Sequence, residues 1–300
     1  AVTAHNRIGT GKAAKFVGKV AGAPGVVSYP GADFTGIDLA GRNFDSANLG
    51  GANLTGSTLT GASLRGANLQ HAWVRRARLG RLVTAAPPTT HVDKHAATRR
   101  NTRASITPGA DLTGADLSGV DLSNTDMSGV TCTNASFVGA LLSHVTFDGA
   151  SCAGADFTNA VFVGASLTNT VLTGAIFTGA RLPDTTLAGA NLTNAAMTGA
   201  VLHGAVLTGT TLGGATLGST DLGGVQSGSI TGTPTTLPAG WQLISGYLIG
   251  NGANLAGANL TGLSLYAANL SGVRSGNITG NPSTLPAGWK VTVGYLIGPD

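Results

Sequence analysis

The sequence contains no glutamate: all 13 acidic residues are aspartate, and charged residues make up only 10% of its 300 residues. Aromatic residues are also scarce, at 5%, whereas glycine occurs 47 times. The chain therefore has the length of an ordinary globular protein but not its composition. A solenoid accounts for this composition, because each coil contacts only its neighbours and the interior is a thin column.

Signals for membrane insertion and secretion are absent as well. No run of about 18 or more apolar residues occurs, so no transmembrane helix is expected. Residues 1–25 carry Arg7, Lys12, Lys15 and Lys19 but no compact apolar block of the signal-peptide type. We expect a chain that is cytoplasmic, incorporated into a particle, or already trimmed.

Catalytic motifs are also missing. There is no glycine-rich phosphate loop followed by lysine, no nucleophile elbow and no cysteine and histidine set with zinc spacing. Asp111, Asp116, Asp121 and Asp126 are five residues apart and so face four different sides, which keeps them from converging as catalytic carboxylates. We predict that the protein is not an enzyme and has no cofactor or small-molecule substrate.

The dominant feature that is present is a period of five. From Leu112 to Leu222 an apolar residue occupies every fifth position, 23 times in succession. Alanine commonly lies two residues before it, as at Ala155, and glycine commonly two after it, as at Gly114. This period matches neither the 3.6 of a helix nor the 2 of a strand. Each unit is therefore expected to be a short bent segment whose central side chain points to one axis.

The unit Ala-(Asp/Asn/Thr/Ser)-Leu-(Thr/Ser)-Gly resembles that of the pentapeptide-repeat family. The resemblance implies an all-β fold, a right-handed quadrilateral β-helix (solenoid) with four pentapeptides per turn. Sorting the central residues by twenties places Phe137, Phe157 and Phe177 in one column. Because neighbouring strands lie about 4.8 Å apart, we expect these rings to form a stacked core ladder.

Repeat boundaries divide the chain into five segments. These are an N-terminal basic arm or cap (1–30), a first β-helical segment (31–80), a basic Pro/Thr-rich loop or linker (81–109), the main β-helix (110–223) and a C-terminal region (224–300). Two interpretations stay open for the arm, which either covers the first coil or binds a partner. Two also stay open for 81–109, which either leaves and re-enters one helix or links two.

The C-terminal region contains an internal duplication. A 27-residue element at 224–250 recurs at 272–298, with an offset of 48 and 19 identical residues, and four pentapeptides lie between the copies. Trp241 in the first copy corresponds to Trp289 in the second. The apolar ends of each copy are expected to form wider strands, and we predict a modified coil or cap rather than a ligand-stacking site.

The two cysteines, Cys132 and Cys152, occupy central positions in one column. We expect free, buried thiols that fill space like small apolar side chains. The Cα atoms of such a pair would be close enough for a disulfide, but parallel side chains in a ladder are not expected to bring the Cβ atoms together.

Charge is divided unevenly along the chain. Residues 1–30 and 75–103 hold 12 of the 17 basic residues and a single acidic one, for a net charge of +11, and the remainder of the chain carries −7. The basic residues are Arg7, Lys12, Lys15, Lys19, Arg75, Arg76, Arg78, Arg81, Lys94, Arg99, Arg100 and Arg103. They are our candidate partner-binding residues. The triplet His91, Asp93 and His95 lacks a fourth ligand, so no metal site is predicted.

Two functions compete at this point. The first is a structural or interaction protein, a rigid rod whose basic segments dock into a larger assembly such as a virion, surface layer or fibre, with other subunits or further copies of itself as partners. The second is association with nucleic acid, by nonspecific phosphate binding through the basic segments. The family resemblance adds a DNA-mimicking, topoisomerase-binding variant, which the lack of glutamate and the basic segments oppose.

Overall fold

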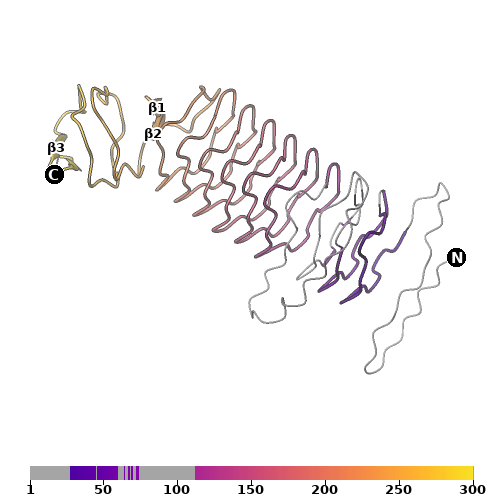
Figure 1. The fold of residues 1–300 in the computed structure, drawn as a ribbon. Coiled ribbons are helices and arrows are strands. Elements are labelled where there is room, and N and C mark those ends of the chain that lie inside the picture. Colours follow the sequence, from indigo (N-terminus) through magenta and orange to yellow (C-terminus); the bar gives the residue numbers. More distant parts are fainter. Residues whose placement is uncertain are drawn as a thin grey trace, which may run out of the picture.

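A computed structural model describes residues 28–44, 46–59, 64, 67, 69, 72–73 and 112–299. Within these ranges there is no helix, and therefore none of the length and apolar character that a membrane crossing requires. The chain instead forms coils that stack along one axis, from the indigo coils to the yellow ones (Figure 1). Asp156 pairs in parallel with Ser136 on one side and with Ile176 on the other, and this offset of four pentapeptides recurs along the stack. The predicted coil length of four pentapeptides is thereby confirmed.

One pentapeptide, residues 155–159, shows why the sequence folds in this way. Ala155 and Phe157 point inward and are fully buried, while the aspartate between them faces outward. The Oδ1 atom of Asp156 accepts hydrogen bonds from the backbone N–H of Thr158 at 2.9 Å and from its hydroxyl at 2.6 Å. Aspartate and asparagine have the right length for this contact two residues ahead. The turn is completed by Asn159, whose φ is +57°.

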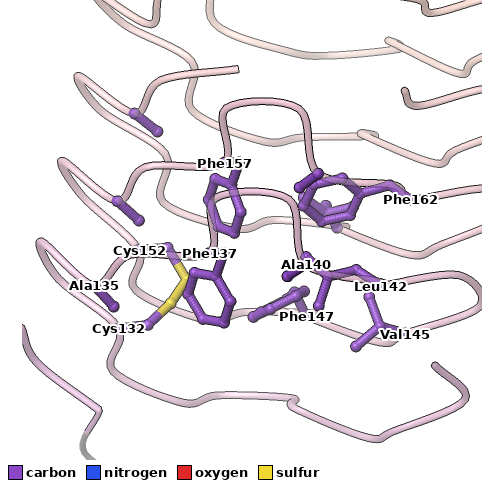
Figure 2. Packing of buried hydrophobic residues seen from close by; sticks show 14 of the residues in the cluster. Cys132, Ala135, Phe137, Ala140, Leu142, Val145, Phe147, Cys152, Phe157 and Phe162 are labelled. Carbon is purple, nitrogen blue, oxygen red and sulfur yellow. A yellow bond between two sulfur atoms is a disulfide. The ribbon is translucent and has the colours of Figure 1, made fainter. Parts of the chain in front are cut away.

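The interior is a set of side-chain columns, and one of them is formed by phenylalanines, which are the largest fully buried side chains of the described residues. The ring centroids of Phe137 and Phe157 are 4.9 Å apart with an interplanar angle of 16°, and those of Phe157 and Phe177 are 4.9 Å apart with an angle of 17°. Phe147 and Phe162 meet this column from the side, at 79° and 66° to Phe157 (Figure 2). All five rings are fully buried, so the column combines apolar burial with favourable ring geometry.

The expectation of free thiols is wrong. Cys132 and Cys152 form a disulfide that joins two successive coils, with a Cα–Cα distance of 4.5 Å (Figure 2). This distance lies within the range that a disulfide spans. The side chains of Cys132 and Cys152 therefore turn toward one another within the stack. The prediction of free thiols assumed that the two side chains stay parallel.

The two repeat segments belong to one stack. The N–H of Leu69 donates to the carbonyl of Asp116 at 2.6 Å, and the N–H of Asp116 donates to the carbonyl of Ala67 at 2.9 Å. Trp73 likewise pairs in parallel with Asp121. Ala67, Leu69 and Trp73 are therefore in the coil next to that of Asp116 and Asp121, which supports one continuous column rather than two separate helices.

Both copies of the duplicated element contain an antiparallel hairpin. Strand β1 (Gln242–Ile244) pairs with β2 (Tyr247–Ile249), and β3 (Lys290–Thr292) pairs with β4 (Tyr295–Ile297). Each turn has two residues with positive φ, a combination typical of tight hairpins. Gln226 pairs with Val206 on one side but with Asn254 on the other, so the coil that holds the first hairpin is longer than a regular one.

The first hairpin separates two hydrophobic cores. Leu243 and Leu248 pack against the long core that starts at Phe34. Tyr247 and Ile249, on the other side of the hairpin, belong to a smaller core formed with coil 251–270. Trp241 packs against the main core and leaves no room for a side chain at Gly250. The tryptophan of each copy is thus part of the modified coil.

Candidate interaction surfaces

The structure does not describe the predicted partner-binding residues. All twelve basic residues, Arg7, Lys12, Lys15, Lys19, Arg75, Arg76, Arg78, Arg81, Lys94, Arg99, Arg100 and Arg103, lie outside the described ranges. So does the triplet His91, Asp93 and His95. Their role in docking stays a prediction.

Acidic and histidine side chains do not gather in the described part of the chain. Within it, no group of three or more histidine, cysteine or acidic residues is arranged to hold a metal ion. Asp116, Asp121 and Asp126 each belong to a different ladder column, as their spacing of five residues indicated.

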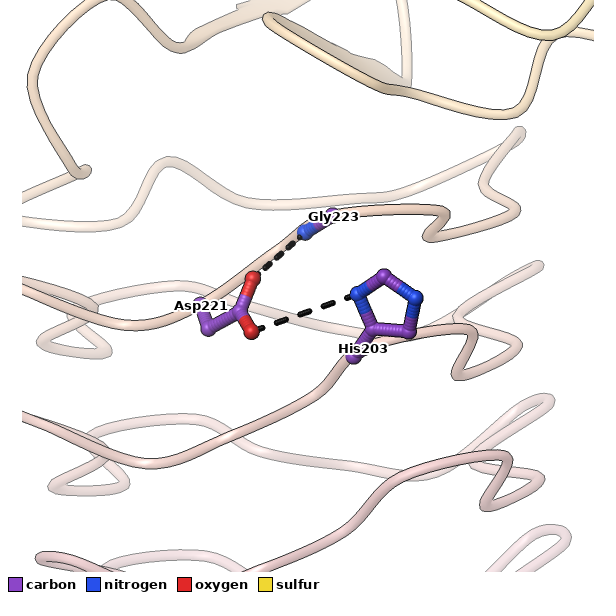
Figure 3. A network of polar contacts seen from close by, with 3 residues as sticks. All are labelled: His203, Asp221 and Gly223. Carbon is purple, nitrogen blue, oxygen red and sulfur yellow. Dashed lines mark hydrogen bonds and ion pairs between the residues drawn. The ribbon is translucent and has the colours of Figure 1, made fainter.

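His203 and Asp221 form an exposed polar pair. The Nδ1 atom of His203 is 4.0 Å from Oδ2 of Asp221, whose Oδ1 accepts a hydrogen bond from the N–H of Gly223 at 2.9 Å (Figure 3). The two side chains are 65% and 52% exposed. Solvent screens such pairs strongly. We therefore assign this pair no catalytic or binding role.

One ladder column presents larger outward side chains than its neighbours. We call it the Trp73 column, and it consists of Asp33, Asn53, Trp73, Asp121, Leu141, Val161, Arg181, Val201 and Asp221. Trp73 is 63% exposed and Leu141 is 45% exposed. Outward positions on the other sides are mostly threonine, serine and aspartate. This column is thus a candidate contact surface, and the sequence signal for it was the interruption of small polar residues at Trp73.

A second candidate surface lies at the C-terminal end of the described stack. We call it the end face, the outer side of hairpin β3–β4 formed by Thr292, Tyr295 and Ile297. Tyr295 is 52% exposed and Ile297 is 41% exposed. Sequence reasoning identified the duplicated element but not this surface, because it did not show which side chains of the hairpin face away from the core.

Charged side chains lie near both ends of the described stack. Arg274 and Lys290 are exposed on the last coil. At the other end, Asp33 and Asp38 are exposed on the coil that starts at Ser28, which also carries the half-buried Arg42. The hydroxyl and the backbone N–H of Thr35 both donate to Asp33, and these hydrogen bonds lower the pKa of its carboxyl group.

Comparison with known families identifies the repeat. The family model described as pentapeptide repeats matches in eight copies, at residues 43–81, 108–143, 125–162, 150–188, 185–224 and 251–274. Together these ranges cover more than half of the chain. No curated protein sequence matches it.

Solved structures similar to this chain are also pentapeptide repeat proteins. HetL from the cyanobacterium Nostoc sp. strain PCC 7120, involved in heterocyst differentiation regulation, is 22% identical, with 85% of this chain and 90% of HetL covered and a TM-score of 0.38. QnrB1, a plasmid-mediated fluoroquinolone resistance protein, is 16% identical, with 69% of this chain and 92% of QnrB1 covered and a TM-score of 0.35. These TM-scores are low, so the repeat model carries the family assignment.

Proposed function

Since the chain belongs to the pentapeptide repeat family, we propose that it is a non-catalytic structural and interaction protein, a right-handed, four-sided β-helical rod that docks into a larger assembly. The observation that carries this proposal is the combination of a continuous ladder with an exposed Trp73 column. Rigid stacked coils present a long surface that loses little conformational entropy on binding. Tryptophan is among the residues that contribute most to protein interfaces.

The basic segments complete the proposal. Residues 1–30 and 75–103 hold twelve basic residues against one acidic residue. We propose that they bind other subunits of a virion, surface layer or fibre. Trp73 lies two residues before Arg75, the first residue of the second segment. The exposed ring and the neighbouring cationic residues would then contact the same partner.

Lysine cross-linking with mass spectrometry on material from the native source tests this function. Four of the five lysines, Lys12, Lys15, Lys19 and Lys94, lie in the basic segments, and the fifth is Lys290. We expect links from the four to another protein or to another copy. Such links should weaken when Trp73 is replaced by serine. If native material yields no links from these lysines, the docking function is wrong.

Association with nucleic acid is the second candidate, favoured by the +11 charge of the basic segments. Neutralising phosphates with arginine and lysine makes affinity fall steeply with salt. An electrophoretic shift of duplex DNA that weakens with salt, and weakens further in a variant with Arg99, Arg100 and Arg103 replaced by glutamine, would support it. If duplex DNA is not shifted, or if its shift does not depend on salt, association with nucleic acid is wrong.

A further inference from the structure

Arg181 lies within the Trp73 column and is the only lysine or arginine between residues 112 and 223. Its side chain is exposed, and its neighbours in the ladder are Val161 and Val201. No ion pair joins it to another described residue. The guanidinium group therefore has no acidic partner among the described residues, and a carboxylate that faces this column would supply one.

Apolar side chains surround Arg181 on this side of the stack. Leu141 is 45% exposed, and Val161 in the same column is half-buried. Val163 and Pro183 follow Val161 and Arg181 two residues later, so they point to the same side and are half-buried too. Flat faces of stacked strands pack against one another at a distance of about 10 Å. A second apolar face with an acidic group opposite Arg181 would therefore cover this one.

The same column of a second copy has these properties when the two stacks run in opposite directions. Their coils then pair in reverse order about a two-fold axis between the coils of Leu141 and Val161. Leu141 faces Val161 at this centre. The pairs further out are Asp121 with Arg181, Trp73 with Val201 and Asn53 with Asp221. Each pair occurs twice because of the symmetry. The column thus matches itself in charge as well as in apolar character.

Other arrangements of the two columns lose this match. If one copy is moved by a single coil, Arg181 faces Leu141 or Trp73 instead of an aspartate. If the two stacks run in the same direction, Arg181 faces Arg181 and Asp121 faces Asp121, and like charges oppose association. Arg181 can also face Asp221, but then only the part of the column from Arg181 to Asp221 overlaps. The charges therefore favour the antiparallel register with the longest overlap.

Asp121 can face Arg181 without giving up its own turn. Its Oδ1 atom accepts the N–H of Ser123 at 3.0 Å, and a carboxylate accepts several hydrogen bonds at once. Asp184 lies at the corner beside this column and would face the exposed Asn124. Among the described residues of this side, no two like charges then face one another.

We propose that the Trp73 column is a self-complementary interface at which two copies of this chain pack antiparallel, with Asp121 of each copy paired to Arg181 of the other. The same surface is used by both copies, so the contact closes at a dimer. This inference rests on the proposed function, because it names one partner of the rod. The dimer is the unit from which the larger assembly would be built.

Sedimentation velocity of the purified 300-residue chain over a range of concentrations tests the proposal. We expect the mean mass to rise to that of a dimer and no further. Leu141→Asp should abolish dimerisation, because it places a carboxylate opposite Val161. Aspartate already occupies this position of the repeat at Asp121, so the variant should fold. Val171→Asp is the matched control, at a ladder residue of another side that is 39% exposed, and it should leave the dimer unchanged.

Two charge variants test the register. Asp121→Arg places arginines opposite each other in the dimer, and Arg181→Asp places aspartates opposite each other. Each variant alone should raise the dissociation constant at least about tenfold. An equal mixture of the two should dimerise like the parent chain, because every charged pair then joins an arginine to an aspartate. Both substitutions use a residue that this column already contains, so neither should disturb the coil.

Three outcomes would overturn the proposal. They are a chain that stays monomeric, an assembly that grows beyond the dimer, and a mixture of the two charge variants that associates no better than either alone. Cross-links from Lys12, Lys15, Lys19 or Lys94 to another protein would in each case leave the proposed function intact. The absence of such links, together with a dimer that follows the charge variants, would instead remove the docking function and leave the self-association.

Discussion

The side chain of Asn169 lies over Gly189 of the next coil, where a β-carbon on that glycine would be. A β-carbon built on Gly189 would be 3.3 Å from Cγ of Asn169, and the amide oxygen would be closer still. The φ of Asn169 is +55° and that of Gly189 is +67°. The same relationship of asparagine above glycine recurs between successive coils at other turns, as with Asn194 and Gly214. Glycine in these turns therefore leaves room for the large residue of the turn before it, although the pairing is not universal, because Asn124 is followed in its column by His144.

We expect Gly189→Ala to be more destabilising than Gly174→Ala. Both glycines have positive φ, which costs alanine about 1 kcal/mol. A β-carbon on Gly174 would have no neighbour within 4 Å, whereas one on Gly189 would meet the amide oxygen of the exposed Asn169 side chain, which would have to leave its rotamer at an added cost of about 0.5–1.5 kcal/mol. Urea unfolding of the two variants measures the difference.

The double variant Asn169→Gly with Gly189→Ala provides the control. It removes the clash and keeps the cost of positive φ at position 189, so its stability should return to the level of Gly174→Ala. If the double variant remains as unstable as Gly189→Ala alone, the contact between these two positions is not the cause.

The hairpin turns supply a matched pair for a stabilising substitution. Val293 has a φ of +48° and is 90% exposed, and the corresponding Ser245 has a φ of +46°. A β-branched side chain is poorly suited to this conformation, whereas asparagine is favoured in it. Val293→Asn should raise the free energy of unfolding by about 1 kcal/mol. Thermal unfolding followed by circular dichroism measures this gain.

The reverse change in the other hairpin checks the explanation. Ser245→Val should lower stability by a similar amount. A loss of stability in Val293→Asn would instead show that the exposed valine contributes favourable contacts.

The sequence was sufficient for the regular part of the fold. A period of five over 23 units determines which side chains point inward, and the columns follow once the coil length is known. The stacked rings of Phe137, Phe157 and Phe177 illustrate this. Nothing comparable exists between Leu79 and Leu112, whose separation is not a multiple of five, so the repeat phase changes there. The pairing of Trp73 with Asp121 across that gap depends on backbone hydrogen bonds that no local pattern encodes.

The candidate surfaces were harder to predict, for physical reasons. Residues 242–249 contain two short apolar runs. This pattern fits a single wide strand as well as a hairpin that has a hydrophobic core on each of its two sides. The end face was identified from the 41% exposure of Ile297. The exposure of a side chain depends on which coils pack against it, so it cannot be predicted from the local sequence. For Cys132 and Cys152, a shared column did not reveal whether the two side chains would turn toward each other.

The disulfide should contribute substantially to the stability of the main column. It closes a loop with a sequence separation of 20 residues, and a cross-link of this size is expected to add about 3 kcal/mol. Cys132→Ala with Cys152→Ala should therefore lower the urea midpoint. A reductant should lower the midpoint of the parent chain and leave that of the double variant unchanged. Two reactive thiols in the denatured, unreduced chain would restore the interpretation of free cysteines.

The phenylalanine column should make Phe157 one of the most sensitive positions in the chain. Its ring is fully buried and stacks on both Phe137 and Phe177, so Phe157→Ala should cost about 3–5 kcal/mol. Phe157→Leu keeps most of the apolar volume and should cost far less, because leucine already occupies other positions of this column, such as Leu117 and Leu217. In a solenoid each coil is stabilised by its neighbours, so a large loss here should also divide the single urea transition into two. Equal costs for the two substitutions would mean that ring stacking, rather than burial, dominates the stability of the column.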